Sequence, residues 1–341
     1  MELTIAILVI LVALVFDFTN GFHDAANAIA TSVSTRAMSP KVALSLAAVM
    51  NLLGALLGTA VATTIAKDIV DLTGLSSIMQ LELVISALIG AIGWNLITWW
   101  FGLPSSSSHA LIGGLTGAGL SAMLFSDTVH IKWTKIVDKV IEPMFLSPLV
   151  GFLLAYILML VFQWALRRRN PERIFGKFRI MQIFSSAALA LGHGLQDAQK
   201  SMGIIFMACA ATGIFGVSHT DETIPFIIMV MCALAIGAGT FAGGKRIMKT
   251  LGTKIVDIDP TRAFAAEAVS AAVLYVTAFF VHAPISTTHT VTSAILGSGA
   301  TKSVKSVRWQ VAGNIMRAWF LTIPASGVLA FAVHQVVSFV L

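Results

Sequence analysis

The chain has 341 residues, of which 57% are hydrophobic and only 11% are charged, and its mean hydropathy is +0.89. Soluble domains are about half apolar and a quarter charged, so this composition excludes water as the main solvent of the fold. The excess of 22 Lys and Arg over 16 Asp and Glu lies mostly in short loops, which is typical of a membrane protein's cytoplasmic side and not of a nucleic-acid-binding surface.

Long apolar stretches recur along the whole chain with only short polar breaks between them. Because a transmembrane helix needs about twenty predominantly apolar residues, we expect these stretches to cross a membrane. Each half begins with one long stretch, at 3–35 and 180–215, and continues with four shorter ones. The shorter ones are expected at 41–66, 83–101, 105–125 and 143–166, with counterparts that begin near Pro225, Arg262, Ile285 and Trp309. The sequence therefore predicts an all-α polytopic membrane protein with about ten net crossings.

Two short motifs occur once in each half of the chain, in the same order. Residues 20–27 (NGFHDAAN) align with residues 193–200 (HGLQDAQK), with a glycine and an aspartate in register. Residues 104–109 (PSSSSH) align with residues 284–289 (PISTTH), with the proline, the hydroxyl residues and the histidine in register. Internal repeats of this kind are a signature of transporter folds. We therefore interpret the chain as a duplication.

The charges of the loops predict how the two halves are oriented. Lys and Arg gather in three short loops, at 167–180, 245–254 and 302–308, and such loops mark the cytoplasmic side. Since each half crosses a net five times, the second half is expected to be inverted, with both termini outside. The expected domains are a first repeat at 1–166, a basic cytoplasmic linker at 167–180 and a second, inverted repeat at 181–341.

Asp24 and Asp197 are carboxylates in otherwise apolar stretches. Burying a carboxylate costs several kcal/mol unless it pairs, takes up a proton or binds a cation. A hydrogen-bond network that ties two helices together is the alternative interpretation. The residues expected to carry a coupling cation are Asp24, Asp197, Asn20, Gln196 and Glu267.

A glycine precedes each of these aspartates by three residues, at Gly21 and Gly194. Glycine permits a helix to unwind, which frees backbone carbonyls for a cation and N–H groups for an anion. We therefore expect the long helix of each half to be broken at this point.

A proline followed by hydroxyl residues begins a helix in each half. Proline suits the first helical turn, and a half-helix that begins near Pro104 or Pro284 inside the membrane would aim free N–H groups and its positive dipole end at an anion. Two such ends fit a tetrahedral oxyanion, phosphate or sulfate, whereas capping by a single hydroxyl is the alternative. The residues expected to bind the anion are Ser106, Ser107, Ser108, Ser286, Thr287, Thr288, Asn27 and Gln199.

Four histidines lie in these motifs, at His23, His109, His193 and His289. Imidazole titrates near physiological pH, so we expect these residues to carry coupling protons or to act as gates. A core histidine bonded to a carbonyl is the alternative. Asn51 lies in the middle of a predicted crossing and is a candidate for cation coordination, with packing as the alternative.

No cofactor and no metal centre are expected beyond a coupling ion, H⁺ or Na⁺. Cys209 and Cys232 lie in apolar segments without metal-ligand spacing, which is typical of packing residues. The basic run at 167–169 is expected to set the membrane topology.

With these motifs the chain resembles the inorganic phosphate transporter (PiT) family, and its bacterial low-affinity phosphate permease branch in particular. The resemblance spans nearly the whole chain and rests on residues 17–24, on the repeated motif at Asp197 and on residues 284–289. It implies an inverted-repeat protein of the cell membrane that carries phosphate, or a metal-phosphate complex, together with sodium or protons. Asn51 stands where similar sodium-coupled members carry a glutamate, which favours the proton.

The expected function is secondary active transport of inorganic phosphate by cation-coupled alternating access. A permease for sulfate or another tetrahedral oxyanion, a passive anion channel and an intramembrane hydrolase are the alternatives. The hydrolase is disfavoured because Ser108 and His109 are adjacent and point different ways on a helix, and because no GxSxG elbow occurs. The expected partners are inorganic phosphate and membrane lipid but no nucleic acid, and a homodimer is left open.

Overall fold

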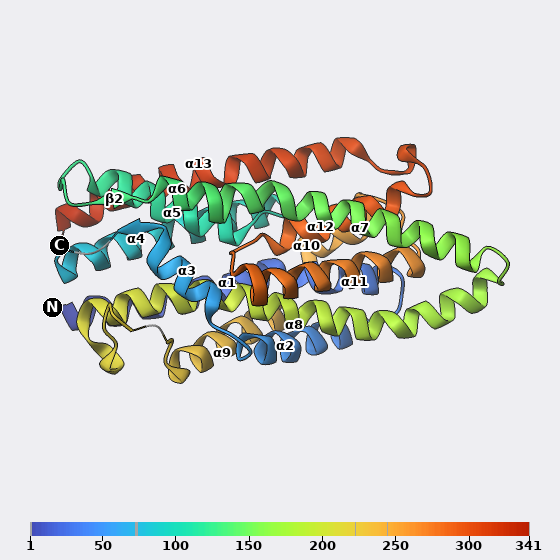
Figure 1. Cartoon of the computed structure of the whole chain (residues 1–341), viewed down its shortest axis with the longest axis horizontal. Coiled ribbons are helices and arrows are strands. Elements are labelled where there is room, and N and C mark those ends of the chain that lie inside the picture. Colours follow the sequence, from blue (N-terminus) through green and yellow to red (C-terminus); the bar gives the residue numbers. More distant parts are fainter. Residues whose placement is uncertain (1, 72–73, 222, 244, 341) are drawn as a thin grey trace.

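The structure is a computed structural model that describes residues 2–71, 74–221, 223–243 and 245–340. Long helices lie side by side along one axis and carry almost the whole described chain (Figure 1). This architecture confirms the prediction of an all-α membrane protein.

The described residues of the first half form seven α-helices. They are α1 (Glu2–Ser34), α2 (Pro40–Ala55), α3 (Ala60–Asp68), α4 (Ser77–Phe101), α5 (Ser107–Ala122), α6 (Trp133–Ile136) and α7 (Glu142–Leu166), with a π-turn η1 (Val137–Ile141). Two short strands, β1 (Val70–Asp71) and β2 (His130–Ile131), pair antiparallel with Val70 opposite Ile131.

The second half follows after a short loop. It contains α8 (Pro171–Thr212), η2 (Ile214–Gly216), α9 (Phe226–Ala242), α10 (Lys245–Lys249), η3 (Thr250–Lys254), α11 (Pro260–Val276), η4 (Thr277–Val281), α12 (Thr287–Ala300), η5 (Val304–Ser306) and α13 (Trp309–Val340).

Local sequence signals explain where several helices begin and end. Proline is the first residue of α2, α8 and α11, and the residue before it, Ser39, Asn170 or Asp259, accepts a hydrogen bond from a free N–H of the first turn. Gly102 ends α4 at φ +64°, a conformation that glycine adopts without strain.

Six helical segments among the described residues are long and apolar enough to span a membrane, or up to eight if two bent helix pairs each count as one span. The helices α5 and α12 have only 16 and 14 residues. At about 1.5 Å per residue they are shorter than the roughly 30 Å hydrocarbon core. They are half-helices, and the count of ten crossings stays a prediction.

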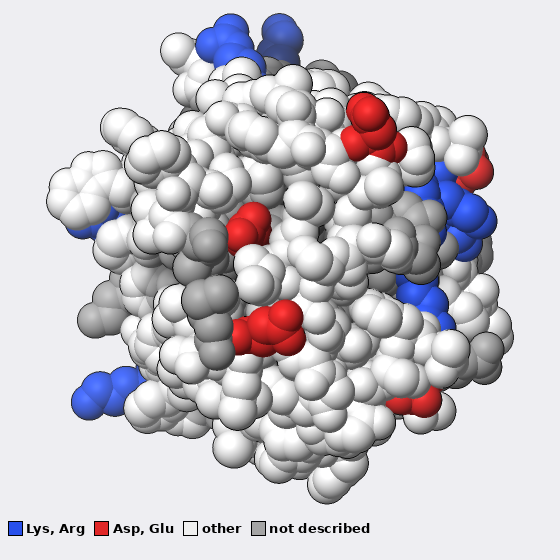
Figure 2. All heavy atoms as spheres, turned by 90° about the vertical axis from the view of Figure 1, so that its left-hand side faces the viewer, with Lys and Arg blue, Asp and Glu red and all other residues white. Residues whose placement is uncertain are grey.

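Both termini lie at one end of the molecule, and the loop between α7 and α8 lies at the other (Figure 1). That loop contains Arg167, Arg168 and Arg169. The positive-inside rule predicts that it lies in the cytoplasm and the termini outside, and this orientation stays a prediction. The terminal face is largely uncharged; acidic groups lie both near its middle and toward its rim, and basic groups lie toward its rim (Figure 2). We call the terminal end the outer end and the opposite one the inner end.

Corresponding helices of the two halves run in opposite directions. The helix α1 runs from the outer end inward and α8 runs outward, and α7 and α13 form a second such pair (Figure 1). The inverted repeat stays a prediction, which this arrangement supports.

The long helices α1 and α8 are continuous, so the predicted break at Gly21 and Gly194 is wrong. Both glycines instead allow another helix to approach closely. A Cβ atom on Gly21 would lie 2.4 Å from the carbonyl oxygen of Ile236 in α9, and one on Gly194 would lie 2.1 Å from that of Asn51 in α2. The absent side chain therefore serves helix packing.

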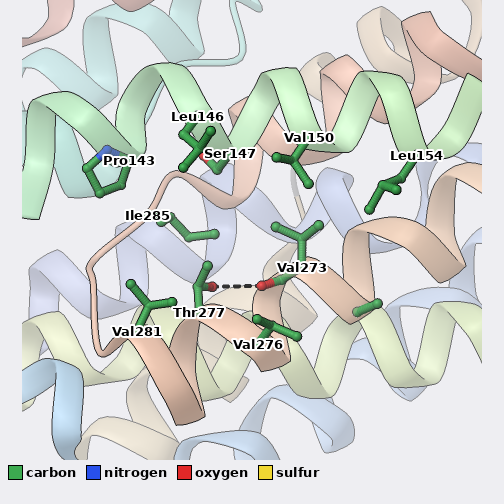
Figure 3. A pocket seen from close by; sticks show the side chains of 11 residues that line it. Pro143, Leu146, Ser147, Val150, Leu154, Val273, Val276, Thr277, Val281 and Ile285 are labelled. Atoms are coloured by element: carbon green, nitrogen blue, oxygen red, sulfur yellow. Dashed lines mark hydrogen bonds between the residues drawn. The ribbon is translucent and has the colours of Figure 1, made fainter.

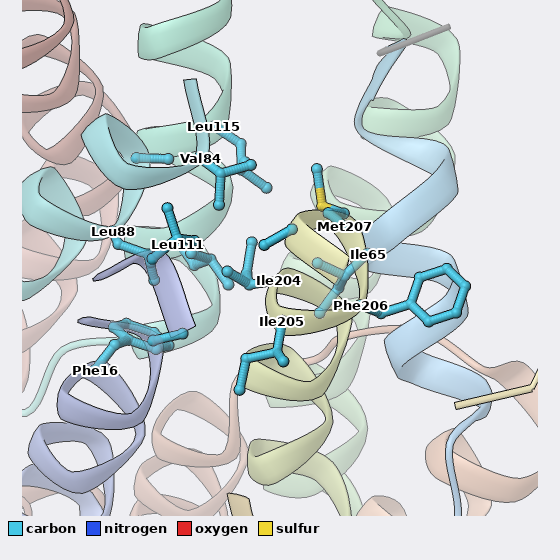
Figure 4. Packing of buried hydrophobic residues seen from close by; sticks show 14 of the residues in the cluster. Phe16, Ile65, Val84, Leu88, Leu111, Leu115, Ile204, Ile205, Phe206 and Met207 are labelled. Carbon is cyan, nitrogen blue, oxygen red and sulfur yellow. The ribbon is translucent and has the colours of Figure 1, made fainter. Parts of the chain in front are cut away.

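Two hydrophobic clusters of described residues lie one toward each end of the long helices. The outer cluster joins the first half of α1 to α4, α5 and the last part of α8, where Phe16, Leu88, Leu111 and Ile204 meet (Figure 4). The inner cluster joins residues 26–30 of α1 to α8, α11 and α12. The polar residues of the repeated motif lie between the two clusters, closed off from both ends.

Candidate functional site

The carboxylate of Asp24 lies where the two half-helices meet α1. Its Oδ2 accepts a hydrogen bond of 3.2 Å from Ser107 on the first turn of α5, and its Oδ1 accepts one of 3.2 Å from Thr288 on the first turn of α12. His23 Nδ1 lies 2.8 Å from the same Oδ1. The four side chains are at most 2% exposed. One carboxylate therefore contacts the beginnings of both half-helices.

Asp197 of α8 lies beside Asp24. Its Oδ1 is 2.9 Å from Lys200 Nζ, and its Oδ2 is 3.2 Å from His193 Nε2. Ligand atoms of Asp24, His193 and Asp197 all lie within 4.8 Å of one another, a grouping that could hold a cation. The structure thus brings the two predicted aspartates, one from each half, to a single place.

Lys200 is not among the predicted site residues, yet its ammonium lies between Asp197 and Ser107. It donates a hydrogen bond of 2.8 Å to Ser107 while it pairs with Asp197, and its side chain is only 1% exposed. The alignment of the two repeated motifs could have identified it, because Lys200 aligns with Asn27, which is a predicted site residue. Asn27 donates correspondingly to Thr288 of the other half-helix, at 2.9 Å.

The predicted hydroxyl residues divide into two groups. Ser106 and Ser286 cap their own helices, accepting from the backbone N–H of His109 and His289, so for these two the capping alternative is correct. The hydroxyls of Ser107 and Thr288 reach the carboxylate of Asp24.

The two remaining hydroxyl residues of the motif are also buried. Ser108 donates to the carbonyl of Ile285, in the segment that leads into α12, and so ties the two half-helices together. Thr287, next to Thr288, is 2% exposed.

Both predicted glutamines form hydrogen bonds with residues outside the group around Asp24 and Asp197. Gln199 accepts from the backbone N–H groups of Val61 and Ala62 at the start of α3 and donates to Leu195. In this structure its amide caps a helix, and its assignment to the anion stays a prediction. Gln196 donates to Thr277 at 2.9 Å and points away from Asp197.

Glu267 belongs to a separate polar cluster toward the inner end. It accepts from Thr31 at 2.6 Å and from Ser32 at 2.7 Å, both on α1, and from Gln182 and Ser185 on α8. Thr31 lies two helical turns inward from Asp24, about 10 Å along the axis. The sequence analysis grouped Glu267 with Asp24, but in the structure the two residues are not neighbours.

The histidines at the ends of the two hydroxyl motifs face each other. The rings of His109 and His289 lie 4.8 Å apart, and His289 stacks on Trp319 of α13 at 3.9 Å. Trp319 in turn donates to the carbonyl of Pro104. These contacts join α5, α12 and α13, so this pair holds the two half-helices against each other.

Asn51 links His193 to α9. Its amide donates to Thr240 at 2.7 Å, and its Oδ1 lies 3.2 Å from His193 Nδ1. Since the other ring nitrogen of His193 faces Asp197, Asn51 orients this imidazole toward the carboxylate.

An apolar pocket of about 310 Å³ is lined by none of the charged residues of this site. It is formed between α7 and α11 by Leu146, Val150, Val273 and neighbouring side chains (Figure 3). Its polar side chains are two hydroxyls, Ser147 and Thr277, and Thr277 donates to the backbone of its own helix at 2.8 Å. A hydrocarbon chain matches this lining and an oxyanion does not.

The chain is similar to known proteins over its whole length. Residues 20–330 match the model of the phosphate transporter family. The chain is 43% identical to a probable low-affinity inorganic phosphate transporter of Bacillus subtilis, over 99% of this chain and 98% of that protein. It is 44% identical to one of Mycobacterium bovis, over 100% of this chain and 79% of that protein.

A solved structure has the same fold. It is described as the sodium-dependent phosphate transporter, superposes with a TM-score of 0.89 at 25% identity, and matches over 99% of this chain and 100% of its own. The family and these relatives are transporters and not enzymes, which rules out the hydrolase. With this match and its membrane-spanning helices, the chain belongs to the phosphate transporter family, as a multi-pass protein of the cell membrane that transports phosphate.

Proposed function

We propose that the chain is a secondary active transporter that carries inorganic phosphate together with a cation, and that this cation is a proton. The observation that carries the proposal is the meeting of two half-helix starts, a buried lysine and two buried aspartates. The N-terminal turns of α5 and α12, with Ser107, Thr288 and Lys200, supply hydrogen-bond donors and positive potential for an oxyanion. Asp24 and Asp197 supply the acceptors for a coupling cation.

In the closed structure the anion donors are already engaged by the carboxylates. Ser107 donates to Asp24 while it accepts from Lys200. An arriving phosphate competes for the same donors, so its binding favours neutralisation of the aspartates by a cation. Anion and cation therefore lower the cost of burying each other, which is the physical basis of coupled transport.

The choice of the proton rests on Asn51, which stands where similar sodium-coupled members carry a glutamate. An amide contributes no charge toward a metal cation, and here it orients the imidazole of His193 toward Asp197. A sodium-dependent protein has the same fold, so sodium is the alternative coupling ion, and an experiment must distinguish it from the proton.

Alternating access requires that the site open to one side at a time. The outer and inner hydrophobic clusters lie on either side of the buried polar residues, and we therefore interpret this structure as an occluded state. The repeats at 1–166 and 181–341, joined by the linker 167–180, are the units that we propose to move relative to each other.

Labelled phosphate uptake into vesicles that contain the purified protein tests the function. We expect accumulation against the phosphate gradient when the outside is made acidic, no requirement for sodium, and weak competition by sulfate. Uptake that only equilibrates would identify a channel. Accumulation that needs a sodium gradient and ignores pH would overturn the proton, and stronger uptake of sulfate than of phosphate would overturn the substrate.

A further inference from the structure

Asp17 is a third buried carboxylate of α1 that no part of the phosphate site uses. It lies two helical turns outward from Asp24, about 10 Å along the axis and on the same face of the helix. Its side chain is 0% exposed, and neither of its carboxylate oxygens has a hydrogen-bond partner. Asp24 and Asp197, by contrast, each lie beside hydroxyl, imidazole or ammonium groups.

The surroundings of Asp17 follow from the antiparallel contact of α1 with α8. Thr35 bonds to Gln182 and Ser32 bonds to Ser186 near the inner end. The same register, continued fifteen residues outward along α1, places Asp17 beside Ser201. Ser201 is the hydroxyl next to Asp17 and can turn its O–H toward the carboxylate, although neither group has a hydrogen bond of normal geometry in this structure.

The remaining neighbours leave Asp17 without a counter-ion. The ionisable groups that face it are Lys200 and Asp197 on α8 and Cys232 on α9. The ammonium of Lys200 is held by Asp197 and Ser107 at 2.9 and 2.8 Å. One turn inward, the amide of Asn20 is fully buried and has no hydrogen-bond partner on its oxygen or its nitrogen.

We propose that Asp17 is a proton-binding site on the outer side of the phosphate site, and that closure of the transporter requires this site to be protonated. The proposal rests on the proposed function and adds to it the residue that binds the transported proton. An ionised carboxylate buried without a partner strongly disfavours the closed state, whereas one proton neutralises it with no further ligand.

The proton is accounted for in both directions. With the site open to the outside, an oxygen of Asp17 gains a hydrogen from outer water, and the neutral carboxylic acid is then buried with the phosphate. With the site open to the inside, the O–H bond breaks and the proton leaves to inner water after the phosphate. Asn20 and Ser201, whose polar groups are free in the closed state, lie beside the path between Asp17 and the central carboxylates.

The test compares Asp17→Asn, Asp17→Glu and the wild-type protein in vesicles. Asn has the shape of the protonated acid but cannot release a proton. In the wild-type protein, the unpaired charge of ionised Asp17 disfavours closure by more than a factor of ten, and this penalty makes closure depend on the proton. Asn carries no charge, so we expect Asp17→Asn to reduce the accumulation driven by a pH gradient by about tenfold or more. Exchange of internal for external phosphate at equal pH should continue. Asp17→Glu should restore part of the accumulation.

The matched control is Glu2→Gln, the same change at an exposed position of the same helix, which should behave as wild type. Asp17→Asn that accumulates phosphate like wild type, with the same number of protons entering per phosphate, would overturn the proposal. So would a variant that loses only a dependence on sodium, because the site would then hold a metal cation.

A second measurement does not depend on transport. The infrared spectrum of the purified closed protein should contain the band of a protonated carboxylic acid that Asp17→Asn lacks and Glu2→Gln keeps. If the band is present and wild-type vesicles take up no phosphate, the proposed function fails while the proton site stands. If the band is absent in wild type, the proton site fails whatever the uptake shows.

Discussion

Lys200 of α8 donates a hydrogen bond of 2.8 Å to Ser107 on the first turn of the half-helix α5. This contact joins a residue of the second half of the chain to the N-terminal turn of a half-helix of the first half. Because the same ammonium pairs with Asp197, the lysine lies between the groups proposed for the anion and those proposed for the cation. Variants at this position therefore test both.

Lys200→Gln should raise the phosphate concentration that half-saturates uptake by about tenfold or more. A hydrogen bond to a charged group contributes about 1.5–3 kcal/mol, and 1.4 kcal/mol corresponds to a factor of ten. The measurement is the concentration dependence of uptake. Lys177→Gln, an exposed lysine of the same helix, is the control. Lys200→Gln leaves Asp197 without its counter-ion, so adding Asp197→Asn should recover the stability that is lost. If Lys200→Gln leaves the concentration dependence of uptake unchanged, Lys200 does not bind the phosphate.

Asp24→Asn should abolish accumulation of phosphate while the protein remains folded in the membrane. The amide keeps the shape of the side chain but cannot neutralise a cation or take up a proton in the same way. Uptake against a gradient and the abundance of the protein in membranes are measured together. Asp127→Asn, an exposed aspartate, should leave both unchanged, and normal accumulation by Asp24→Asn would contradict the coupling role.

The hydroxyl residues of the half-helices should separate into two classes of variant. Ser107→Ala and Thr288→Ala remove groups that reach Asp24, so they should raise the half-saturating phosphate concentration severalfold. Ser106→Ala and Ser286→Ala remove helix caps and should cost about 1 kcal/mol of stability. Uptake kinetics and thermal unfolding in detergent distinguish the classes, and identical behaviour of all four variants would refute the division.

Gly21→Ala and Gly194→Ala should destabilise the protein strongly, because the added Cβ would meet a backbone oxygen at 2.4 and 2.1 Å. Gly176→Ala is the matched control, since it lies within α8 and its Cβ would meet nothing within 4 Å. That change should stabilise the helix by up to about 1 kcal/mol. Thermal unfolding provides the measurement. Equal unfolding temperatures for the three variants would show that the close packing does not matter.

Glu267→Gln should lower stability without changing the half-saturating phosphate concentration. It would weaken a cluster in which Glu267 accepts from two hydroxyls of α1 and from two side chains of α8, while the anion site lies about two turns away. Glu172→Gln, at the exposed start of α8, is the comparison. A large rise in the phosphate requirement would instead link Glu267 to the transported ions.

Much of the candidate site was predictable from the sequence, because the signals are local. Asp24 and Asp197 were identified as carboxylates that apolar stretches cannot bury unpaired. Ser107 and Thr288 were identified by the proline before them, which predicts a helix start inside the membrane. The structure adds that these residues from both halves meet at one place.

The sequence by itself determined the membrane environment, the duplication of the motifs and the half-helices, since composition and capping residues act within a few turns of chain. Only the tertiary structure decided that Lys200 and not its neighbour Gln199 contacts Ser107 and Asp197. Adjacent residues of a helix point about 100° apart, and the neighbouring helices determine which of them meets these groups. It also decided that Gly21 serves close packing instead of a break. Glycine permits both, and the choice depends on whether another helix lies against it.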